Sequence, residues 1–358
     1  MNTPAPTPGR LYLVPAPLDF GCEPQAPLRD ALPDATLATA ARITHWVCEN
    51  AKSTRAFLKR VGGLHELAAP LQEQQIMMSM RLRDIGTMGT VPTMMASMRY
   101  GYKLIGISNE EAATNDIWVR PDSPLAKAAG AVPNYPDIYG NADLWKGKKI
   151  LATTVSTGHY ALTSTLKAMG LKDSDVNIVH MEQGQAMTAF NAGEGDILQL
   201  WAPLSYVAEA KKWVRVSSGA AAKVSIAGGI GVRKEFAEKH PDLTIAWLNI
   251  YMGILEDMKA NPDKYVKPLL DYFNSYCGLE LTEDMVKLEF KYRPLYTVSE
   301  QVREMETPSM LPASLRGVAE FMLSQGRIRQ KEFDGYVKQN FFIDASFMKK
   351  VAQERAAK

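Results

Sequence analysis

Two turns rich in small and hydroxyl-bearing residues are the part of this chain best suited to bind a ligand. The first, residues 85–92, reads Ile-Gly-Thr-Met-Gly-Thr-Val-Pro, and the second, residues 152–160, reads Ala-Thr-Thr-Val-Ser-Thr-Gly-His-Tyr. Each follows a short apolar run typical of a buried strand and precedes a predicted helix. The first N–H groups of a helix lack intrahelical acceptors and carry partial positive charge, so such a turn favours an anion. Two of them predict two lobes that face one ligand.

The expected contacts in these turns are backbone N–H groups and hydroxyls. They are Thr87, Met88 and Gly89 from the first turn, and Ser156, Thr157, Gly158 and His159 from the second. An ordinary strand-to-helix turn, with a Ser or Thr hydroxyl that caps the helix, explains the same residues without a ligand. His159 has no partner evident in the sequence that would make it an acid or a base, so we expect no catalytic residue.

The segments around these turns alternate between strand and helix patterns, which is typical of a mostly parallel, doubly wound sheet. We expect strands at residues 103–107, 117–120, 149–152, 176–180 and 196–200, and a return of the chain to the first lobe near residues 225–232. We expect helices at residues 91–98, 159–169, 183–192, 204–212, 241–259, 263–275, 283–290, 298–306 and 315–325.

The composition excludes several classes of protein. The chain has 358 residues, 46% hydrophobic and 22% charged, which is ordinary for a globular protein long enough for two domains. A net charge of +2, with dispersed Lys and Arg, gives no reason to expect nucleic acid as a partner. No apolar run is long enough to span a bilayer. The cysteines Cys22, Cys48 and Cys277 form neither a disulfide framework nor a zinc-type spacing, so we expect no metal.

An ordered series of segments resembles the periplasmic solute-binding proteins of ABC importers, in the branch that includes nitrate-, sulfonate- and taurine-binding proteins. The series comprises residues 84–89, 144–150, 156–160, 169–176, 189–196, 201–203 and 240–243. The resemblance covers roughly residues 80–345. It implies an α/β type II periplasmic-binding-protein fold with two lobes, each a mostly parallel sheet flanked by helices. Lobe 1 is expected at residues 80–122 and 223–345, and lobe 2 at residues 123–222.

The resemblance also implies a function without catalysis. The chain is expected to be the solute-binding component of an ABC importer. A small anionic or zwitterionic organic solute, such as a sulfonate or a taurine-like compound, would bind between the lobes, and a membrane permease subunit would be the partner. No cofactor is implied, and we expect a monomer. Members of this family are exported, whereas residues 1–9 lack the features of a secretory signal, so the chain as written is expected to be cytoplasmic unless its start is misassigned.

Four further positions are candidates for the ligand site. Asn109, Glu110 and the adjacent Glu111 follow a predicted strand, and carboxylates there would receive an amine and repel a bare anion. A solvated acidic turn explains them equally well. Trp201 stands where the family usually has Trp-Glu-Pro, with Ala202 in place of the Glu. Its ring would stack on a ligand or pack against the protein.

The N-terminal segment, about residues 10–75, resembles a different family, the tetrapyrrole-methylase-like methyltransferases that use S-adenosylmethionine. Residues 11–15 and 49–60 carry this resemblance, in a predicted order of strand 11–18, a helix-compatible stretch at 26–42, strand 43–47 and helix 53–61. Only about the first quarter of such an enzyme would be present. Residues 1–75 therefore read as a truncated methyltransferase-like segment, and an inactive methyltransferase or a non-functional gene fusion is the alternative function.

The same segment stands where the solute-binding family has a strand, a helix and a second strand of lobe 1. Its strand-helix-strand-helix order predicts that it can fill these vacant positions, since right-handed crossovers make such units geometrically alike. An appendage beside an interrupted lobe 1 is the alternative.

Overall fold

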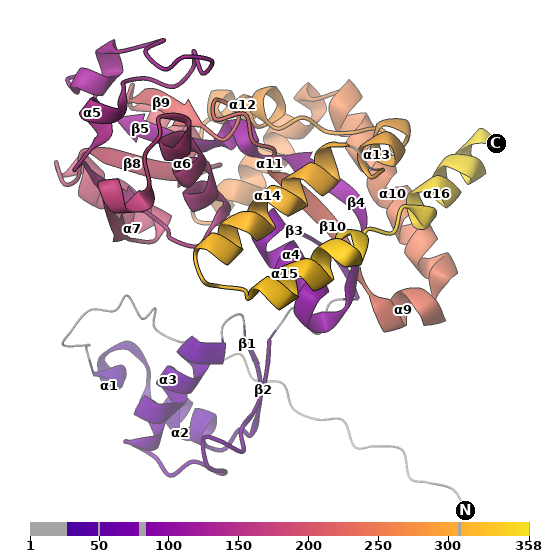
Figure 1. Ribbon diagram of the computed structural model, residues 1–358. Helices are drawn as coiled ribbons and strands as arrows, with labels where there is room; N and C mark the ends of the chain where they lie inside the picture. Colours follow the sequence, from indigo (N-terminus) through magenta and orange to yellow (C-terminus); the bar gives the residue numbers. More distant parts are fainter. Residues whose placement is uncertain (1–26, 49–50, 79–83, 276, 307–308, 358) are drawn as a thin grey trace, which may run out of the picture. The chain divides into compact units, whose positions relative to one another are not determined.

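The computed structural model describes residues 27–48, 51–78, 84–275, 277–306 and 309–357 (Figure 1). The chain forms two compact units, Met1–Arg83 and Asp84–Lys358. The strand expected at residues 11–18 and the thiol of Cys22 lie outside the described residues. The described helices include none that is both long and apolar enough to cross a membrane.

The first unit has a small core of its own between two parallel strands and three helices. Its elements are α1 (Leu28–Ala31), α2 (Asp34–Ala41), β1 (His45–Cys48), α3 (Ala51–Gly62) and β2 (Gln75–Met78). Leu37, Leu58 and Val61 are fully buried in this core. The indole N–H of Trp46 donates to the Gln74 side chain over 3.0 Å, which ties β1 to the segment before β2. The predicted strand 43–47 and helix 53–61 are confirmed as β1 and α3, while the docking of this unit in lobe 1 stays a prediction.

A five-stranded sheet forms one lobe of the second unit. Its spatial order is β7 (Asn177–His180), β6 (Lys149–Ala152), β8 (Ile197–Trp201), β5 (Asn115–Val119) and β9 (Val214–Ser218). β6 pairs parallel with both β7 and β8, whereas β5 runs antiparallel to β8 and β9. The crossover helices are α6 (Thr157–Ala168), α7 (Gln183–Asn191) and α8 (Leu204–Ala210). The predicted alternation of strands and helices is confirmed here.

A three-stranded sheet forms the other lobe, in the order β3 (Ile85–Met88), β10 (Ala227–Arg233) and β4 (Tyr102–Glu110). β10 runs antiparallel to both neighbours. A mostly parallel sheet was expected in this lobe, and for these three strands that expectation was wrong. The central strand β10 brings the chain back from the five-stranded sheet, so it runs in the opposite direction to β3 and β4. Helix α4 (Thr90–Tyr100) follows β3 directly and packs on this sheet.

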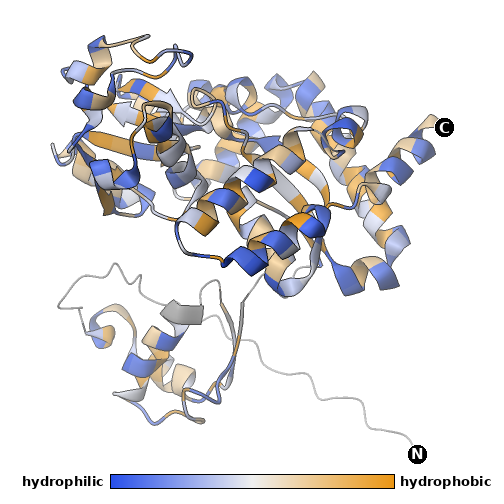
Figure 2. Cartoon of the chain, viewed as in Figure 1, coloured by the Kyte–Doolittle hydropathy of each residue, from blue (hydrophilic) through white to orange (hydrophobic). Residues whose placement is uncertain are grey.

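The C-terminal half is largely helical and covers both lobes. The helices are α9 (Lys234–Lys239), α10 (Pro241–Ala260), α11 (Asp263–Ser275), α12 (Glu283–Tyr292), α13 (Val298–Glu304), α14 (Met310–Ser324), α15 (Gln330–Lys338) and α16 (Ser346–Ala356), and the short α5 (Ala142–Trp145) precedes β6. α14 packs on β10 and α16 on β4, whereas α12 packs on α8 of the other lobe. Figure 2 shows apolar residues on the strands and mixed faces on the helices.

At Ile107, a side chain satisfies the backbone groups on the outer edge of β4. The fully buried Gln301 of α13 accepts from the Ile107 N–H over 2.7 Å and donates to the Ile107 carbonyl over 2.6 Å. We expect Gln301→Leu to lower the free energy of unfolding by about 2 kcal/mol or more, because both buried backbone groups lose their partner. Urea denaturation measures this change.

The matched control is Gln353→Leu, which makes the same replacement at an exposed position of α16. It should change stability by less than about 0.5 kcal/mol. Equal losses in the two variants would contradict the role given to Gln301.

Candidate functional site

A cavity of about 390 Å³ lies between the beginnings of α4 and α6, one helix from each lobe. It is lined by Gly89, Val91, Pro92, Glu111, Thr114, Asn115, Val155, Ser156, Thr157, Trp201, Ala202 and Arg293. The two turns singled out in the sequence therefore meet at one cavity.

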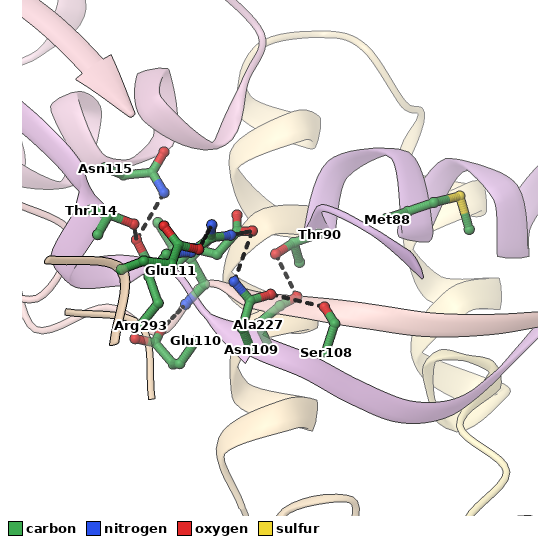
Figure 3. Close-up of polar contacts among 12 residues, drawn as sticks. Met88, Thr90, Ser108, Asn109, Glu110, Glu111, Thr114, Asn115, Ala227 and Arg293 are labelled. Carbon is green, nitrogen blue, oxygen red and sulfur yellow. Dashed lines mark hydrogen bonds and ion pairs between the residues drawn. The ribbon is translucent and has the colours of Figure 1, made fainter. Parts of the chain in front are cut away.

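Helix α4 begins without a side-chain cap. Its N-cap residue is Gly89, and no side chain accepts from the first turn. The two hydroxyls nearest this end point elsewhere, since Thr90 donates to the Ala227 carbonyl over 2.7 Å and Thr93 to the Met88 carbonyl over 3.1 Å (Figure 3). The N–H groups of Thr90 and Val91 have no intrahelical acceptor at this position. They give this wall of the cavity a partial positive charge.

Helix α6 begins with a capped but strained turn. Ser156 Oγ accepts from the His159 N–H over 3.1 Å, which leaves the N–H groups of Thr157 and Gly158 without an intrahelical acceptor. Val155 has φ of 61°, in the left-handed region that β-branched residues avoid. Strain of this kind persists only where surrounding contacts impose it, and it is frequent at ligand sites.

His159 supplies the contact that imposes this strain. Its Nδ1 accepts from the Val155 N–H over 3.1 Å, and its Nε2 lies 3.1 Å from Asp173 Oδ2. Although burial opposes it, hydrogen bonds from His159 and Thr163 hold the pKa of Asp173 below its usual value. His159 is only 3% exposed and lies outside the cavity lining. His159 therefore positions the turn without lining the cavity.

Gly158 is a glycine for a steric reason. A Cβ atom at this position would lie 1.8 Å from Nε2 of Gln199, which is fully buried on β8. Neither atom of the Gln199 amide has a hydrogen-bond partner among the described residues. The absence of a side chain at Gly158 lets α6 lie directly on β8, which brings the start of α6 to the cavity.

A further part of the cavity wall carries a cluster of ion pairs. Arg293 Nη2 lies 2.6 Å from Glu111 Oε1, and its Nη1 lies 2.5 Å from Glu289 Oε1. The hydroxyl of Tyr206 donates to the second oxygen of Glu289 over 2.6 Å. Although burial alone would lower the pKa of Arg293, the carboxylates of Glu289 and Glu111 raise it above its usual value. Arg293 is therefore a permanently charged part of the wall.

Glu110 and Asn109 lie next to Glu111 at the end of β4 (Figure 3). The Glu110 carboxylate accepts from the N–H groups of Ile226 over 2.7 Å and Ala112 over 3.1 Å, which joins the end of β4 to the start of β10. Burial raises the pKa of Glu110, although these N–H groups oppose the shift. The Asn109 amide contacts Ser108 and, with its oxygen turned toward Arg293, accepts from that guanidinium. Neither residue lines the cavity.

Four of the residues expected at the site line the cavity: Gly89, Ser156, Thr157 and Trp201. Six lie outside the lining: Thr87, Met88, Asn109, Glu110, Gly158 and His159. Figure 3 shows the Met88 side chain pointing away from Glu111 and Arg293. Contacts of these residues with a ligand stay predictions.

Arg293 is the charged lining residue that sequence reasoning missed. It reaches Glu111 across 182 positions of the chain, and no local pattern marks it. Thr114 and Asn115 were missed as well, although they follow the acidic turn closely, and Asn115 is paired with Trp201 in the sheet. The described residues contain no group of three or more His, Cys, Asp or Glu placed to hold a metal ion.

The chain has relatives among known proteins and shares its fold with solved structures. No protein-family model matches the chain. It is 26% identical over 249 residues to the "Putative ABC transporter periplasmic binding protein" of Brachyspira hyodysenteriae, which covers 70% of each chain. It is 27% identical over 200 residues to the taurine-binding periplasmic protein of Escherichia coli, which covers 54% of this chain and 62% of that relative.

Solved structures agree on the architecture. The periplasmic aliphatic sulphonate binding protein SsuA from Escherichia coli matches with a TM-score of 0.56 at 16% identity, over 80% of this chain and 88% of that one. The desulfurization enzyme DSZB matches with a TM-score of 0.55 at 15% identity, over 88% of this chain and all of that one, 100%. These likenesses concern the fold, and they confirm the expected two-lobed α/β class.

By name these relatives are a putative ABC transporter periplasmic binding protein, a taurine-binding periplasmic protein and a putative aliphatic sulfonates-binding protein. Each is named as a binding protein, which agrees with the expected binding role. They lend no support to the expected methyltransferase-like N-terminal segment.

Because Gly158 packs on Gln199, a larger residue at position 158 should destabilise the protein. We expect Gly158→Ala to lower the free energy of unfolding by about 1–3 kcal/mol, because the added methyl group overlaps the Gln199 amide. The double variant Gly158→Ala with Gln199→Ala should regain at least half of this loss. Thermal denaturation of the three proteins measures both effects.

Gly184 of α7 provides the control, because a Cβ atom there meets nothing within 4 Å. Gly184→Ala should leave stability unchanged or raise it slightly. A loss in Gly158→Ala that the second substitution fails to reduce would contradict the steric explanation.

Proposed function

We propose that this chain is the solute-binding component of an ABC importer and that it binds a small organic anion of the sulfonate class between its lobes. The observation that carries the proposal is the cavity between two helix beginnings, each with N–H groups that lack intrahelical acceptors. A sulfonate presents three acceptor oxygens and a full negative charge, so it matches backbone N–H groups and the partial charge of a helix N-terminus.

The names of the relatives support the same class of solute. One is a taurine-binding protein, and two are putative aliphatic sulfonates-binding proteins. Trp201 and Val91 add apolar surface to the lining, which suits the carbon chain of an organosulfonate. The two lobes would close on this solute, and a membrane permease subunit would recognise the closed form.

The side chains of the lining bear on the choice between binding and catalysis. Nucleophilic catalysis requires a nucleophile held by a base within hydrogen-bond reach. Among the described residues, the lining contains neither a cysteine nor a histidine, and Cys48 and Cys277 lie elsewhere. The likeness to the desulfurization enzyme concerns the fold. The periplasm would be the site of action, as for the relatives.

Thr157→Pro tests the proposal at one N–H group. Thr157 is the first residue of α6, where proline is well tolerated, and Ser156 before it is already extended at φ −121° and ψ 174°. The substitution removes one N–H donor and keeps the helix. We expect the affinity for an alkanesulfonate to fall about tenfold or more, as measured by isothermal titration calorimetry, because a charge-assisted hydrogen bond is lost.

Thr157→Val is the matched control, since it removes the hydroxyl and keeps the N–H group. It should retain most of the affinity. Equal affinities of Thr157→Pro and the unchanged protein would show that the anion does not bind at α6, and no binding of any sulfonate by the unchanged protein would refute the proposed class.

A further inference from the structure

We propose that pH controls solute binding in this cavity, because two histidines hold the turn before α6 only while their imidazoles are neutral. The proposal rests on the proposed function and adds a regulation of that site. Its observations are two consecutive backbone N–H groups that donate to imidazole nitrogens, and a carboxylate in contact with one of these imidazoles.

The turn before α6 is held at two consecutive backbone positions. The Val155 N–H donates to His159 Nδ1 over 3.1 Å, and the Thr154 N–H donates to His180 Nδ1 over 3.1 Å. Ser156, the N-cap residue of α6, follows directly. Because a backbone N–H can only donate, each Nδ1 must offer a lone pair, and the imidazole must be neutral with its proton on Nε2.

A second proton on His159 would end its contact with the turn. A protonated imidazole donates from both nitrogens and accepts at neither, so two N–H groups would face each other at this position. The contact that holds Val155 at φ 61° would be lost. Val155 would then relax to the extended region that β-branched residues prefer, and the N–H groups of Thr157 and Gly158 would turn away from the cavity.

The surroundings of His159 provide a partner for this second proton. Its Nε2 lies 3.1 Å from Asp173 Oδ2. The hydrogen bonds that hold the pKa of Asp173 below its usual value keep this carboxylate ionised in mildly acidic solution. From α14, the Phe321 ring meets the His159 ring edge-on at 5.2 Å, and the uncharged Gln325 side chain donates to Asp173 over 3.0 Å. Histidine is the side chain that ordinarily changes charge between about pH 5 and 8.

Two acidic residues lie near the other parts of this arrangement. Glu182 Oε1 is 4.0 Å from His180 Nε2, and Glu320 of α14 acts on Tyr160, the residue after His159. The His180 side chain is 56% exposed, so water can replace its contact with Thr154 at little cost. His159 is 3% exposed, and water cannot do the same there. The effect of pH should therefore come mainly from His159.

The contact with Val155 decides the direction of the effect. An added positive charge on His159 would by itself favour an anion in the cavity. Asp173 touches the same ring and offsets that charge, whereas the Val155 N–H is in direct contact with the nitrogen that gains the proton. Protonation should therefore weaken the binding of an anionic solute.

Isothermal titration calorimetry of the full chain with ethanesulfonate tests this inference, because a sulfonate stays ionised in mildly acidic solution. We expect the affinity to fall about tenfold or more from about pH 8 to about pH 5. His159→Asn keeps an acceptor oxygen in the place of Nδ1 and cannot take up a proton. It should bind at both ends of this range, with a fall of about threefold or less.

His240→Asn is the matched control, since it removes an exposed imidazole at the N-cap of α10, where asparagine is favoured. It should keep the whole fall in affinity. Asp116, whose pKa burial raises to about 7, also changes charge in this range. The comparison of His159→Asn with the unchanged protein therefore isolates the contribution of His159.

Asp173→Asn gives a second, independent readout. It removes the partner of the imidazolium, so the fall in affinity should move to lower pH. A pH-independent affinity, a fall that persists in His159→Asn, or an unmoved profile in Asp173→Asn would overturn this inference and leave the proposed function in place. Failure of the unchanged protein to bind ethanesulfonate at any pH would overturn both.

Discussion

The geometry of the site depends on the first turn of α6. Its free N–H groups reach the cavity because Val155 adopts a left-handed conformation, and the ring of His159 holds that conformation through the Val155 N–H. Gly158 lets the same turn lie on β8 against Gln199. An extended Val155 would redirect the helix axis, and a larger residue at Gly158 would lift the helix from the sheet. Packing of the turn against His159 and Gln199 therefore fixes the part of the cavity wall that favours an anion.

The charged part of the cavity wall is assembled from distant parts of the chain. Glu111 follows β4, Arg293 follows α12, and Tyr206 lies on α8 of the other lobe, yet one network of ion pairs and hydrogen bonds joins them through Glu289. The network crosses from one lobe to the other beside the cavity. It therefore places charge at the site and also connects the two lobes, with Arg293, Glu111 and Glu289 all partly buried.

The features that depend on residues close together in the sequence could be predicted from the sequence. The two turns were found because small and hydroxyl residues stand between a predicted strand and a predicted helix, although a capped turn without a ligand explains the same residues. Trp201 was found by its place after a strand. Arg293 could not be found, because its role arises only from folding across 182 positions. Glu110 was expected in the site, but its side chain turns back to Ile226 and Ala112, and irregular pairing of β4 with β10 decides that direction. The strand β9 and the helix α16 were also missed, since Val214–Ser218 is short and α16 is rich in charged residues.

A crystal structure of the full chain with an alkanesulfonate is the most direct test of this account, whose central claim is that the anionic group of the solute binds at the start of α6. We predict sulfonate oxygens within hydrogen-bond distance of the Thr157 and Gly158 N–H groups. An alkanesulfonate with its sulfonate away from α6, or bound outside the cavity, would contradict the account.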